Sequence, residues 1–312
     1  MRLDVEHRLA FAYDGYIRES FLELRVQPKT TAHQTVGSFV LAVGPPTRVA
    51  RYTDWNGNLV HHFGVTRYHD RIEVLSRSAV STHPPAGTTP AIELPHRLHD
   101  FLQFGGPVRL SPALRKFQRS LTVPRGARPG DRVKAISGQI GRHFTYQKDV
   151  TRYDSSTDDF LKLGAGVCQD FAHLMLAVLR GLGIPCRYVS GYLHVDAKGD
   201  APSQSHAWVE FYSPGDGWVA FDPTHDREVD ERYVVVGHGR HYDDVPPNRG
   251  IFRGTAREVL TAEVRTRATG ERPLLGAPEA IQLIDLPVFK EIPERRRDYD
   301  IVAAEAAAQQ QQ

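Results

Sequence analysis

The chain has 312 residues, of which 40% are hydrophobic, and this is long enough for about two folded domains with apolar cores. Its formal net charge of +2 gives no reason to expect a nucleic acid or an anionic membrane as a partner. The N-terminus carries charges where a signal peptide needs an apolar run, and no apolar run reaches the roughly 20 residues of a membrane span. We therefore expect a cytoplasmic protein, and two cysteines are too few for a disulfide framework.

Residues 1–83 predict an N-terminal antiparallel β domain. Apolar and polar residues alternate in short segments divided by turn residues, as at Leu22, Leu24 and Val26. The pair Asn56-Gly57 between apolar runs is typical of a hairpin turn. We expect about six strands arranged as a small sandwich.

The next segment, residues 84–127, is rich in proline and glycine and predicts a linker. A helix is predicted from near Gly130 to Phe144, at the start of a second domain that we place at residues 128–270. The C-terminal extension, residues 271–312, ends in an Ala-Gln-rich tail and is predicted to be partly disordered.

A further helix is predicted directly after a glycine-rich turn, with Cys168 in its first turn. Its apolar residues recur at the spacing of one helix face packed on a core; they are Phe171, Leu174, Met175, Val178, Leu179 and Leu182. The positive end of the helix dipole stabilises a thiolate in this position, and free backbone N–H groups there could bind a developing oxyanion. The alternative is that Cys168 is only a small buried side chain.

Three strands are predicted after this helix, and the last two form a hairpin around residues 213–217. If these strands pair about a centre near Pro214, His206 lies opposite Asp222 within a residue or two of register. Opposed residues have Cβ atoms about 4.5–5.5 Å apart, which a carboxylate-to-imidazole hydrogen bond can bridge. The hairpin therefore supplies a base and a carboxylate that orients it.

A thiol at Cys168, an imidazole at His206 and a carboxylate at Asp222 are the parts of a Cys-His-Asp nucleophilic site. The same three residues could instead hold zinc. Because the chain lacks paired CxxC or HExxH spacing, we expect no metal and no cofactor. The other cysteine, Cys186, is predicted to be a small buried side chain at the start of a strand.

Four blocks in this order resemble the transglutaminase-like superfamily, in particular its bacterial members with an N-terminal β region. They are GVCQDFAH from Gly166, GIPCRYVSGY from Gly183, SHAWVE from Ser205 and GWVAFDPT from Gly217. The resemblance implies an α+β fold with a papain-like core, in which Cys168 is the nucleophile, His206 the base and acid, and Asp222 the group that orients the imidazole. One departure is His225, which stands where many relatives have Asn.

The expected reaction is thiol-dependent acyl transfer on a peptide or protein amide. The resulting thioester goes to water or to an amine, and we expect hydrolysis because no separate acceptor-binding feature is visible. Gln169, Tyr146 and Trp208 are candidates for substrate binding or for the second oxyanion donor, although each is also explained by packing or surface position. The alternatives are a non-catalytic peptide-binding scaffold of the same fold and a true crosslinking transglutaminase.

Residues 234–247 predict a strand that leads to a loop beside the site. His238 and His241 are expected to be structural or rim residues rather than a metal pair. Asp243 and Asp244 are expected to lie in a solvated loop. Farther on, Val259 and Val264 indicate one or two more strands that complete a sheet.

Overall fold

The structure, a computed structural model, describes residues 1–84, 93–195, 205–270 and 279–293. The chain divides into two compact units. The first, the β unit, comprises Met1–Thr82, Leu193–Gln204 and Pro247–Gln312, and the second, the α+β unit, comprises His83–Tyr192 and Ser205–Pro246. The predicted disorder of the C-terminal tail falls on residues outside the described ranges from 294 onward.

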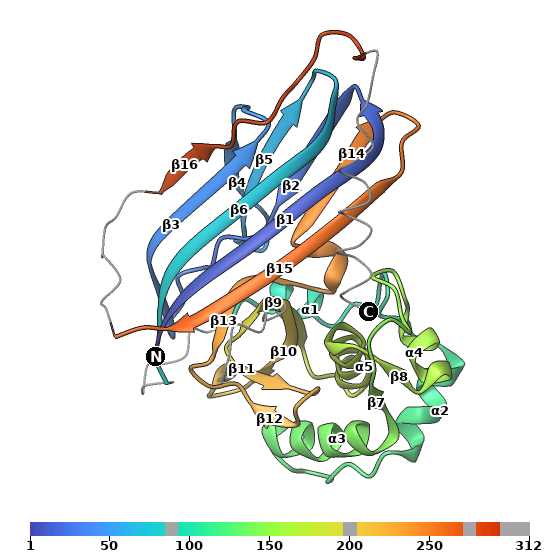
Figure 1. The fold of residues 1–312 in the computed structure, drawn as a ribbon. Helices are drawn as coiled ribbons and strands as arrows, with labels where there is room; N and C mark the ends of the chain where they lie inside the picture. Colours follow the sequence, from blue (N-terminus) through green and yellow to red (C-terminus); the bar gives the residue numbers. More distant parts are fainter. Residues whose placement is uncertain (85–92, 196–204, 271–278, 294–312) are drawn as a thin grey trace. The chain divides into compact units, whose positions relative to one another are not determined.

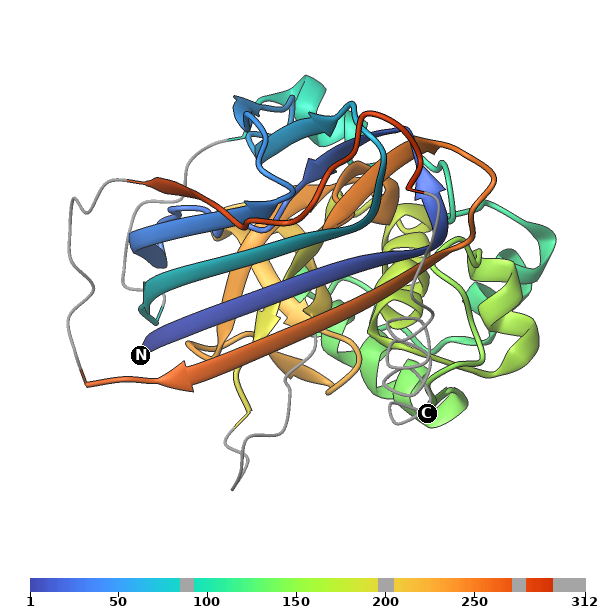
Figure 2. The same ribbon diagram turned by 45° about the horizontal axis from the view of Figure 1, so that its top comes forward.

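Two sheets form the β unit (Figures 1 and 2). The larger has the order β15-β1-β6-β3-β16 and is antiparallel except for its edge pair β16–β3. Its strands are β1 (Arg2–Ile17), β3 (Gln34–Gly44), β6 (His69–Thr82), β15 (Glu258–Ala268) and β16 (Ala280–Leu283). The smaller has the order β14-β2-β5-β4, with β2 (Glu19–Leu24), β4 (Ala50–Thr53), β5 (Leu59–Val65) and β14 (Asn248–Arg253).

One apolar core joins the two sheets of the β unit. Alternate residues of β1, among them Leu9, Phe11 and Tyr13, are buried, as the period of two in the sequence predicts. Leu24 of β2 and Phe63 of β5 belong to the same buried cluster. The predicted antiparallel β domain at the N-terminus is therefore confirmed.

The strands β14 and β15 pair with the N-terminal part of the chain rather than with the second predicted domain. Ile251 of β14 lies opposite Phe21, and Val264 of β15 lies opposite His7. The compact α+β unit therefore ends at Pro246, and the expected boundary at residue 270 differs from the structure. Alternation along a strand does not specify which distant strand it pairs with, so this boundary was not readable from the sequence.

The predicted linker also differs from the structure, because its described part is folded into the α+β unit. Two short helices, α1 (Pro95–Asp100) and α2 (Pro112–Ser120), occupy it. Val108 and Leu114 are fully buried and belong to the core of this unit. Proline begins both helices at positions where its missing N–H has no intrahelical partner to lose.

A five-stranded sheet and a central helix organise the α+β unit (Figure 1). The sheet has the order β12-β11-β10-β9-β13, with β9 (Cys186–Leu193), β10 (Ser205–Ser213), β11 (Gly217–Asp222), β12 (Arg227–Glu228) and β13 (Tyr233–Gly239). The remaining elements are α3 (Pro129–His143), β7 (Thr145–Tyr146), α4 (Thr157–Leu163), β8 (Ala165–Gly166), α5 (Cys168–Gly181) and the 3₁₀ turn η1 (Tyr242–Asp244). Residues 170–180 of α5 are all buried, so this helix is the centre of the core rather than a surface helix with one apolar face.

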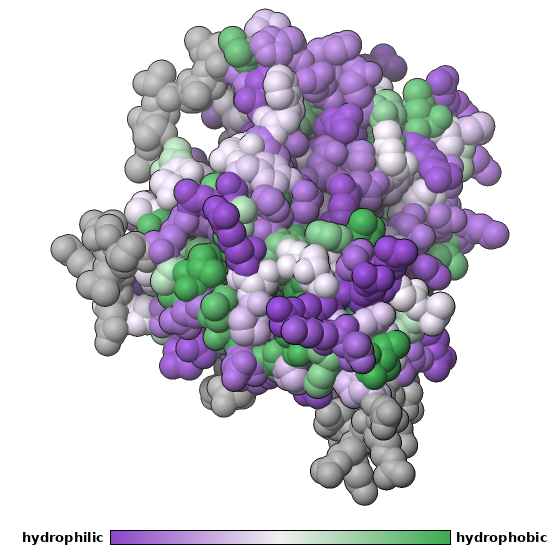
Figure 3. Space-filling view, turned by 90° about the horizontal axis from the view of Figure 1, so that it is seen from above, coloured by the Kyte–Doolittle hydropathy of each residue, from purple (hydrophilic) through white to green (hydrophobic). Residues whose placement is uncertain are grey.

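Across the described residues, no helix combines the length and apolar character that a membrane crossing requires. Hydrophilic side chains cover much of the face shown in Figure 3, and the hydrophobic patches between them are small.

Candidate active site

The first turn of α5 carries Cys168, and the loop before it is held by Asp170. Asp170 Oδ2 accepts hydrogen bonds from the Val167 backbone N–H at 2.8 Å and from Thr151 Oγ1 at 2.7 Å. A Cβ atom on Gly166 would lie 2.5 Å from this carboxylate oxygen, so only glycine fits there. These contacts hold the backbone that leads into α5. Cys168 therefore has a defined position at the N-terminus of α5, the positive end of the helix dipole.

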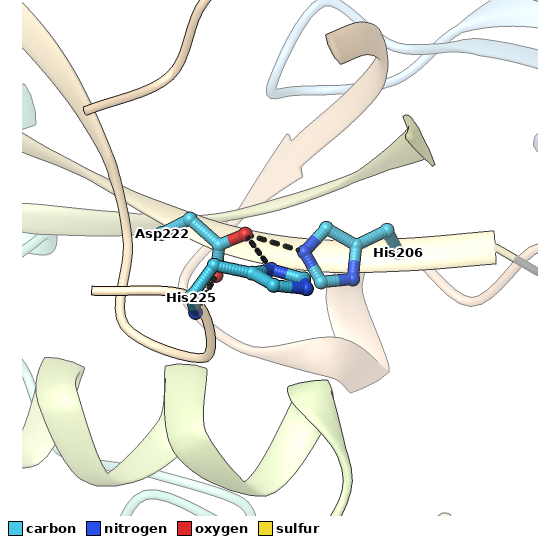
Figure 4. A group of neighbouring side chains, drawn as sticks. All are labelled: His206, Asp222 and His225. Carbon is cyan, nitrogen blue, oxygen red and sulfur yellow. Dashed lines mark hydrogen bonds and ion pairs between the residues drawn. The ribbon is translucent and has the colours of Figure 1, made fainter. Parts of the chain in front are cut away.

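The hairpin of β10 and β11 brings His206 to Asp222. Val209 pairs with Phe221 and Ser213 with Gly217, so the hairpin is centred on Gly215 and Asp222 lies two residues away from the position directly opposite His206. A diagonal pair is still within reach of long side chains. His206 Nε2 and Asp222 Oδ2 are 2.7 Å apart (Figure 4).

The third member of the group, Cys168, contacts the same imidazole. Burial alone would lower the pKa of His206, but side-chain hydrogen bonds with Asp222 and Cys168 and the negative charges of both raise it to about 10. Because Asp222 occupies Nε2, Nδ1 is the ring nitrogen left for the thiol. The structure thus brings together Cys168, His206 and Asp222, the three residues that the sequence places in one site.

The Asp222 side chain is fully buried and accepts hydrogen bonds on both oxygens. His206, His225 Nδ1 and the Tyr233 hydroxyl each lie 2.7 Å from Oδ2. Oδ1 accepts from the backbone N–H of Thr224 at 2.9 Å and of His225 at 3.4 Å. Burial opposes ionisation, yet these donors and the His206 charge hold the pKa of Asp222 well below its usual range, so the carboxylate stays ionised.

Two residues of this network were not found from the sequence. Tyr233, at the start of β13, donates its hydroxyl to Asp222, and its ring lies 5.9 Å from the His206 ring. Arg227 Nε donates to the Tyr233 hydroxyl at 2.9 Å. Neither residue belongs to a recognised block, and the only signal for them is their position shortly after Asp222.

His225 lies on the carboxylate itself. The sequence marks His225 as a departure from relatives. In the structure its Nδ1 is hydrogen-bonded to Asp222 Oδ2, the same oxygen that bonds His206. The two imidazole rings are 5.3 Å apart by centroid.

The three candidate substrate or oxyanion residues lie in different settings. Trp208 is fully buried and stacks on His206, with the two ring centroids 6.1 Å apart. The Nε1 of Trp208 has no hydrogen-bond partner among the described residues. Tyr146 is 45% exposed, and burial and the nearby Cys168 raise its pKa. Gln169 donates its side-chain amide to the Tyr153 carbonyl at 2.7 Å, so one of its two amide hydrogens is committed to a loop.

The second cysteine has a different environment. Cys186 is fully buried, its Sγ lies 3.6 Å from the Leu176 carbonyl oxygen, and burial raises the pKa of its thiol to about 11. Neither Cys186 nor Cys168 forms a disulfide. A thiol of this kind is protonated at neutral pH and unreactive.

The end of β13 and the loop that follows it are closely packed. His238 and His241 are both buried, His238 Nε2 lies 3.5 Å from Glu210 Oε2, and His241 packs against Gly106. Asp244 accepts hydrogen bonds from the backbone and side chain of Arg240 at 2.9 and 3.0 Å. Asp244 is thus paired within the loop rather than solvated.

Comparison with known proteins identifies the family. The model of the transglutaminase-like superfamily matches residues 115–223, and the model of the bacterial transglutaminase-like N-terminal region matches residues 3–81. An uncharacterized protein of Mycobacterium leprae is 36% identical over 278 residues, which cover 84% of this chain and 97% of that protein. A protein-glutamine gamma-glutamyltransferase of Pseudomonas aeruginosa is 34% identical over 123 residues, which cover 36% of this chain and 18% of that protein.

Among solved structures, a candidate cysteine protease from Cytophaga hutchinsonii matches with a TM-score of 0.69 and 24% identity, covering 89% of this chain and 94% of that one. This likeness shows the fold. Together with the family models and the M. leprae relative, it establishes that the chain belongs to the transglutaminase-like superfamily. Within that superfamily it joins an α+β transglutaminase-like core to the N-terminal region of the bacterial members.

Proposed function

We propose that this chain catalyses thiol-dependent acyl transfer on peptide or protein amides and that hydrolysis is favoured over transamidation. The observation that carries the proposal is the contact of one imidazole with two partners. His206 bonds the Cys168 thiol at a helix N-terminus and the buried Asp222 carboxylate. This arrangement combines a nucleophile, a general base and an orienting group.

In the resting site, the proton of Cys168 is transferred to His206. The raised pKa of His206, about 10, favours the imidazolium form of its ring at neutral pH, and the ionised Asp222 stabilises that positive charge. The thiolate attacks the amide carbonyl, and the backbone N–H groups at the start of α5 stabilise the oxyanion. The His206 imidazolium then protonates the leaving amine, which leaves a thioester on Cys168.

In the second half of the reaction, neutral His206 takes a proton from water, which attacks the thioester and releases the acid. A primary amine in place of water gives transamidation. This second outcome is supported by the partial likeness to a protein-glutamine gamma-glutamyltransferase. Hydrolysis is favoured because no acceptor-binding feature accompanies the triad in the sequence.

The test begins with the thiols. Iodoacetamide alkylation of Cys168 and Cys186 is followed by peptide mass from pH 5 to 9, in the wild type and in His206→Ala. Cys168 should be alkylated rapidly at neutral pH and below, and it should lose this reactivity in the variant. Cys186 is the internal control and should stay inert in both proteins.

Reaction class is then measured as ammonia release from a set of glutamine-containing peptides, with and without a fluorescent primary amine. Ammonia without amine incorporation supports hydrolysis, and incorporation into the peptide supports transamidation. Equal inertness of both cysteines across this pH range would overturn the nucleophile assignment and favour a non-catalytic peptide-binding scaffold. Cys168→Ala is the negative control for both readouts.

A further inference from the structure

Two imidazoles converge on a single oxygen beside Cys168. His206 Nε2 and His225 Nδ1 each lie 2.7 Å from Asp222 Oδ2, and the three ligand atoms are all within 4.8 Å of one another. Figure 4 shows the two rings next to each other beside the carboxylate, with one of its oxygens joined to a nitrogen of each ring. The zinc alternative drawn from the sequence used Cys168 as the third ligand, whereas the structure offers His225.

The chemistry of this group suits a borderline transition-metal ion. Two imidazole nitrogens and one carboxylate oxygen are the ligands of three-coordinate protein sites that leave a fourth position open. Ligand atoms around tetrahedral zinc lie about 2.0–2.1 Å from the ion and hence about 3.3 Å from one another. The carboxylate must therefore withdraw from the two nitrogens by roughly half an ångström, and the two N–H protons must leave to solvent.

Access and preorganisation also favour binding. The His225 side chain is 43% exposed, whereas those of His206 and Asp222 are 10% and 0% exposed, so an ion can reach the group from the His225 side. The backbone N–H of His225 is held by Asp222 Oδ1, which keeps the His225 ring beside the carboxylate. The ligands are thus arranged before the ion arrives.

We propose that His206, Asp222 and His225 form an inhibitory site for zinc or a similar divalent transition-metal ion. The inhibition, though not the binding, rests on the function proposed above. An ion on His206 Nε2 replaces the proton there, so the ring becomes a neutral imidazole whose remaining proton is on Nδ1, the nitrogen that faces Cys168. This ring is a much weaker acid than the imidazolium that protonates the leaving amine, because loss of its last proton would leave an imidazolate. The ion also separates His206 from its orienting carboxylate.

The test separates binding from activity. Zinc binding is measured by calorimetry in Cys168→Ala, which removes the thiol as a ligand, and in the double variants Cys168→Ala/His225→Asn and Cys168→Ala/His143→Asn. Asparagine at 225 can still donate a hydrogen bond to Asp222, and His143 is an exposed histidine on α3 that serves as the matched control. Circular dichroism shows that each variant is folded.

We expect one zinc ion per chain in Cys168→Ala, at least about tenfold weaker binding with His225→Asn, and no change with His143→Asn. In the Cys168-containing enzyme, His225→Asn should raise the zinc concentration for half-inhibition by a similar factor, relative to its own uninhibited rate. Unchanged affinity with His225→Asn would overturn the site. Loss of binding in Cys168→Ala would instead assign the ion to the thiol. If the chain proves inactive, the calorimetry still decides the binding.

Discussion

At the residue scale, Asp222 connects groups that come from different parts of the sequence. It holds the imidazole of His206, the ring and backbone of His225, and the hydroxyl of Tyr233, which is itself held by Arg227. A fully buried carboxylate with this many donors is ionised over the whole range in which a thiol enzyme works. Its negative charge is one of the reasons why the pKa of His206 is raised.

The first prediction concerns that charge. In Asp222→Asn the pKa of His206 should fall by about one to three units from its wild-type value of about 10, because the imidazolium loses an adjacent anion. In the wild type, the imidazolium therefore persists as pH rises until about 10, and in the variant it is lost earlier. NMR titration of the His206 ring, assigned with His206→Ala, measures the change.

The matched control is Tyr233→Phe, which removes one donor to the carboxylate and keeps its charge. The His206 midpoint should move far less than in Asp222→Asn. If Tyr233 is a positioning residue, the rate of the chemical step should fall while the Michaelis constant stays within about twofold, since the buried hydroxyl bonds Asp222 and Arg227. A His206 midpoint that is the same in Asp222→Asn and wild type would contradict the electrostatic role of Asp222.

At the scale of elements, the site depends on how β8 turns into α5. Gly166 and Val167 form a short connection before α5. The third residue of the helix, Asp170, accepts a hydrogen bond from the Val167 backbone N–H in this connection. The same loop is packed on Phe160 of α4. A change of backbone here moves the thiol without altering any residue of the proposed triad.

The prediction at this scale is that Gly166→Ala lowers the free energy of unfolding by about 1–3 kcal/mol and lowers the reactivity of Cys168. The added Cβ would lie 2.5 Å from Asp170 Oδ2 and 2.9 Å from the Phe160 ring, so the loop must shift. Urea unfolding and iodoacetamide alkylation measure the two effects. Gly141→Ala on α3 is the matched control, since its Cβ meets nothing within 4 Å and alanine should stabilise the helix by up to about 1 kcal/mol. Equal stabilities of the two variants would argue against the crowding of the loop.

At the scale of the whole molecule, the β unit is completed by strands that follow the α+β unit in sequence. β15 pairs with β1 along Leu3 to Tyr13, and β14 pairs with β2. The ring centroids of Tyr13 and Phe252 of β14 are 5.1 Å apart. The Tyr13 hydroxyl donates a hydrogen bond to Glu258 Oε2 of β15 at 2.9 Å. The N-terminal segment alone is therefore an incomplete domain with an open edge on its longest strand.

The prediction at this scale concerns truncation. A chain that ends at Pro246 lacks β14, β15 and β16, and we expect residues 1–82 to become sensitive to protease while the chain tends to aggregate. A chain that ends at residue 293 keeps every described strand and is the matched control, with protection equal to that of the full chain. Limited proteolysis with peptide mapping measures both. Full protection of residues 1–82 in the shorter chain would show that the early strands fold without their C-terminal partners.

The features predicted from the sequence depend on short-range patterns. The period-3.6 run after Cys168 and the alternation on either side of residues 213–217 place a helix, two strands and a turn. The N-terminal β region and the α+β class follow from similar patterns and are confirmed. The pairing of β10 with β11 was expected about one residue away from its true centre, an error that a diagonal side-chain contact tolerates.

By itself, the sequence determined the local elements and the hairpin that brings His206 to Asp222, because a helix start and a hairpin are set by residues that lie near one another in the chain. The contact of Cys168 with His206 joins the helix α5 to the strand β10 and belongs to the tertiary structure. Only the tertiary structure decided that β14 and β15 return to the N-terminal sheets and that Tyr233 and His225 share the Asp222 carboxylate. Strand partners and hydrogen bonds across loops depend on which surfaces meet in the folded chain. The free energy that stabilises these pairings and hydrogen bonds comes from burial and from close contacts between segments that are far apart in the sequence.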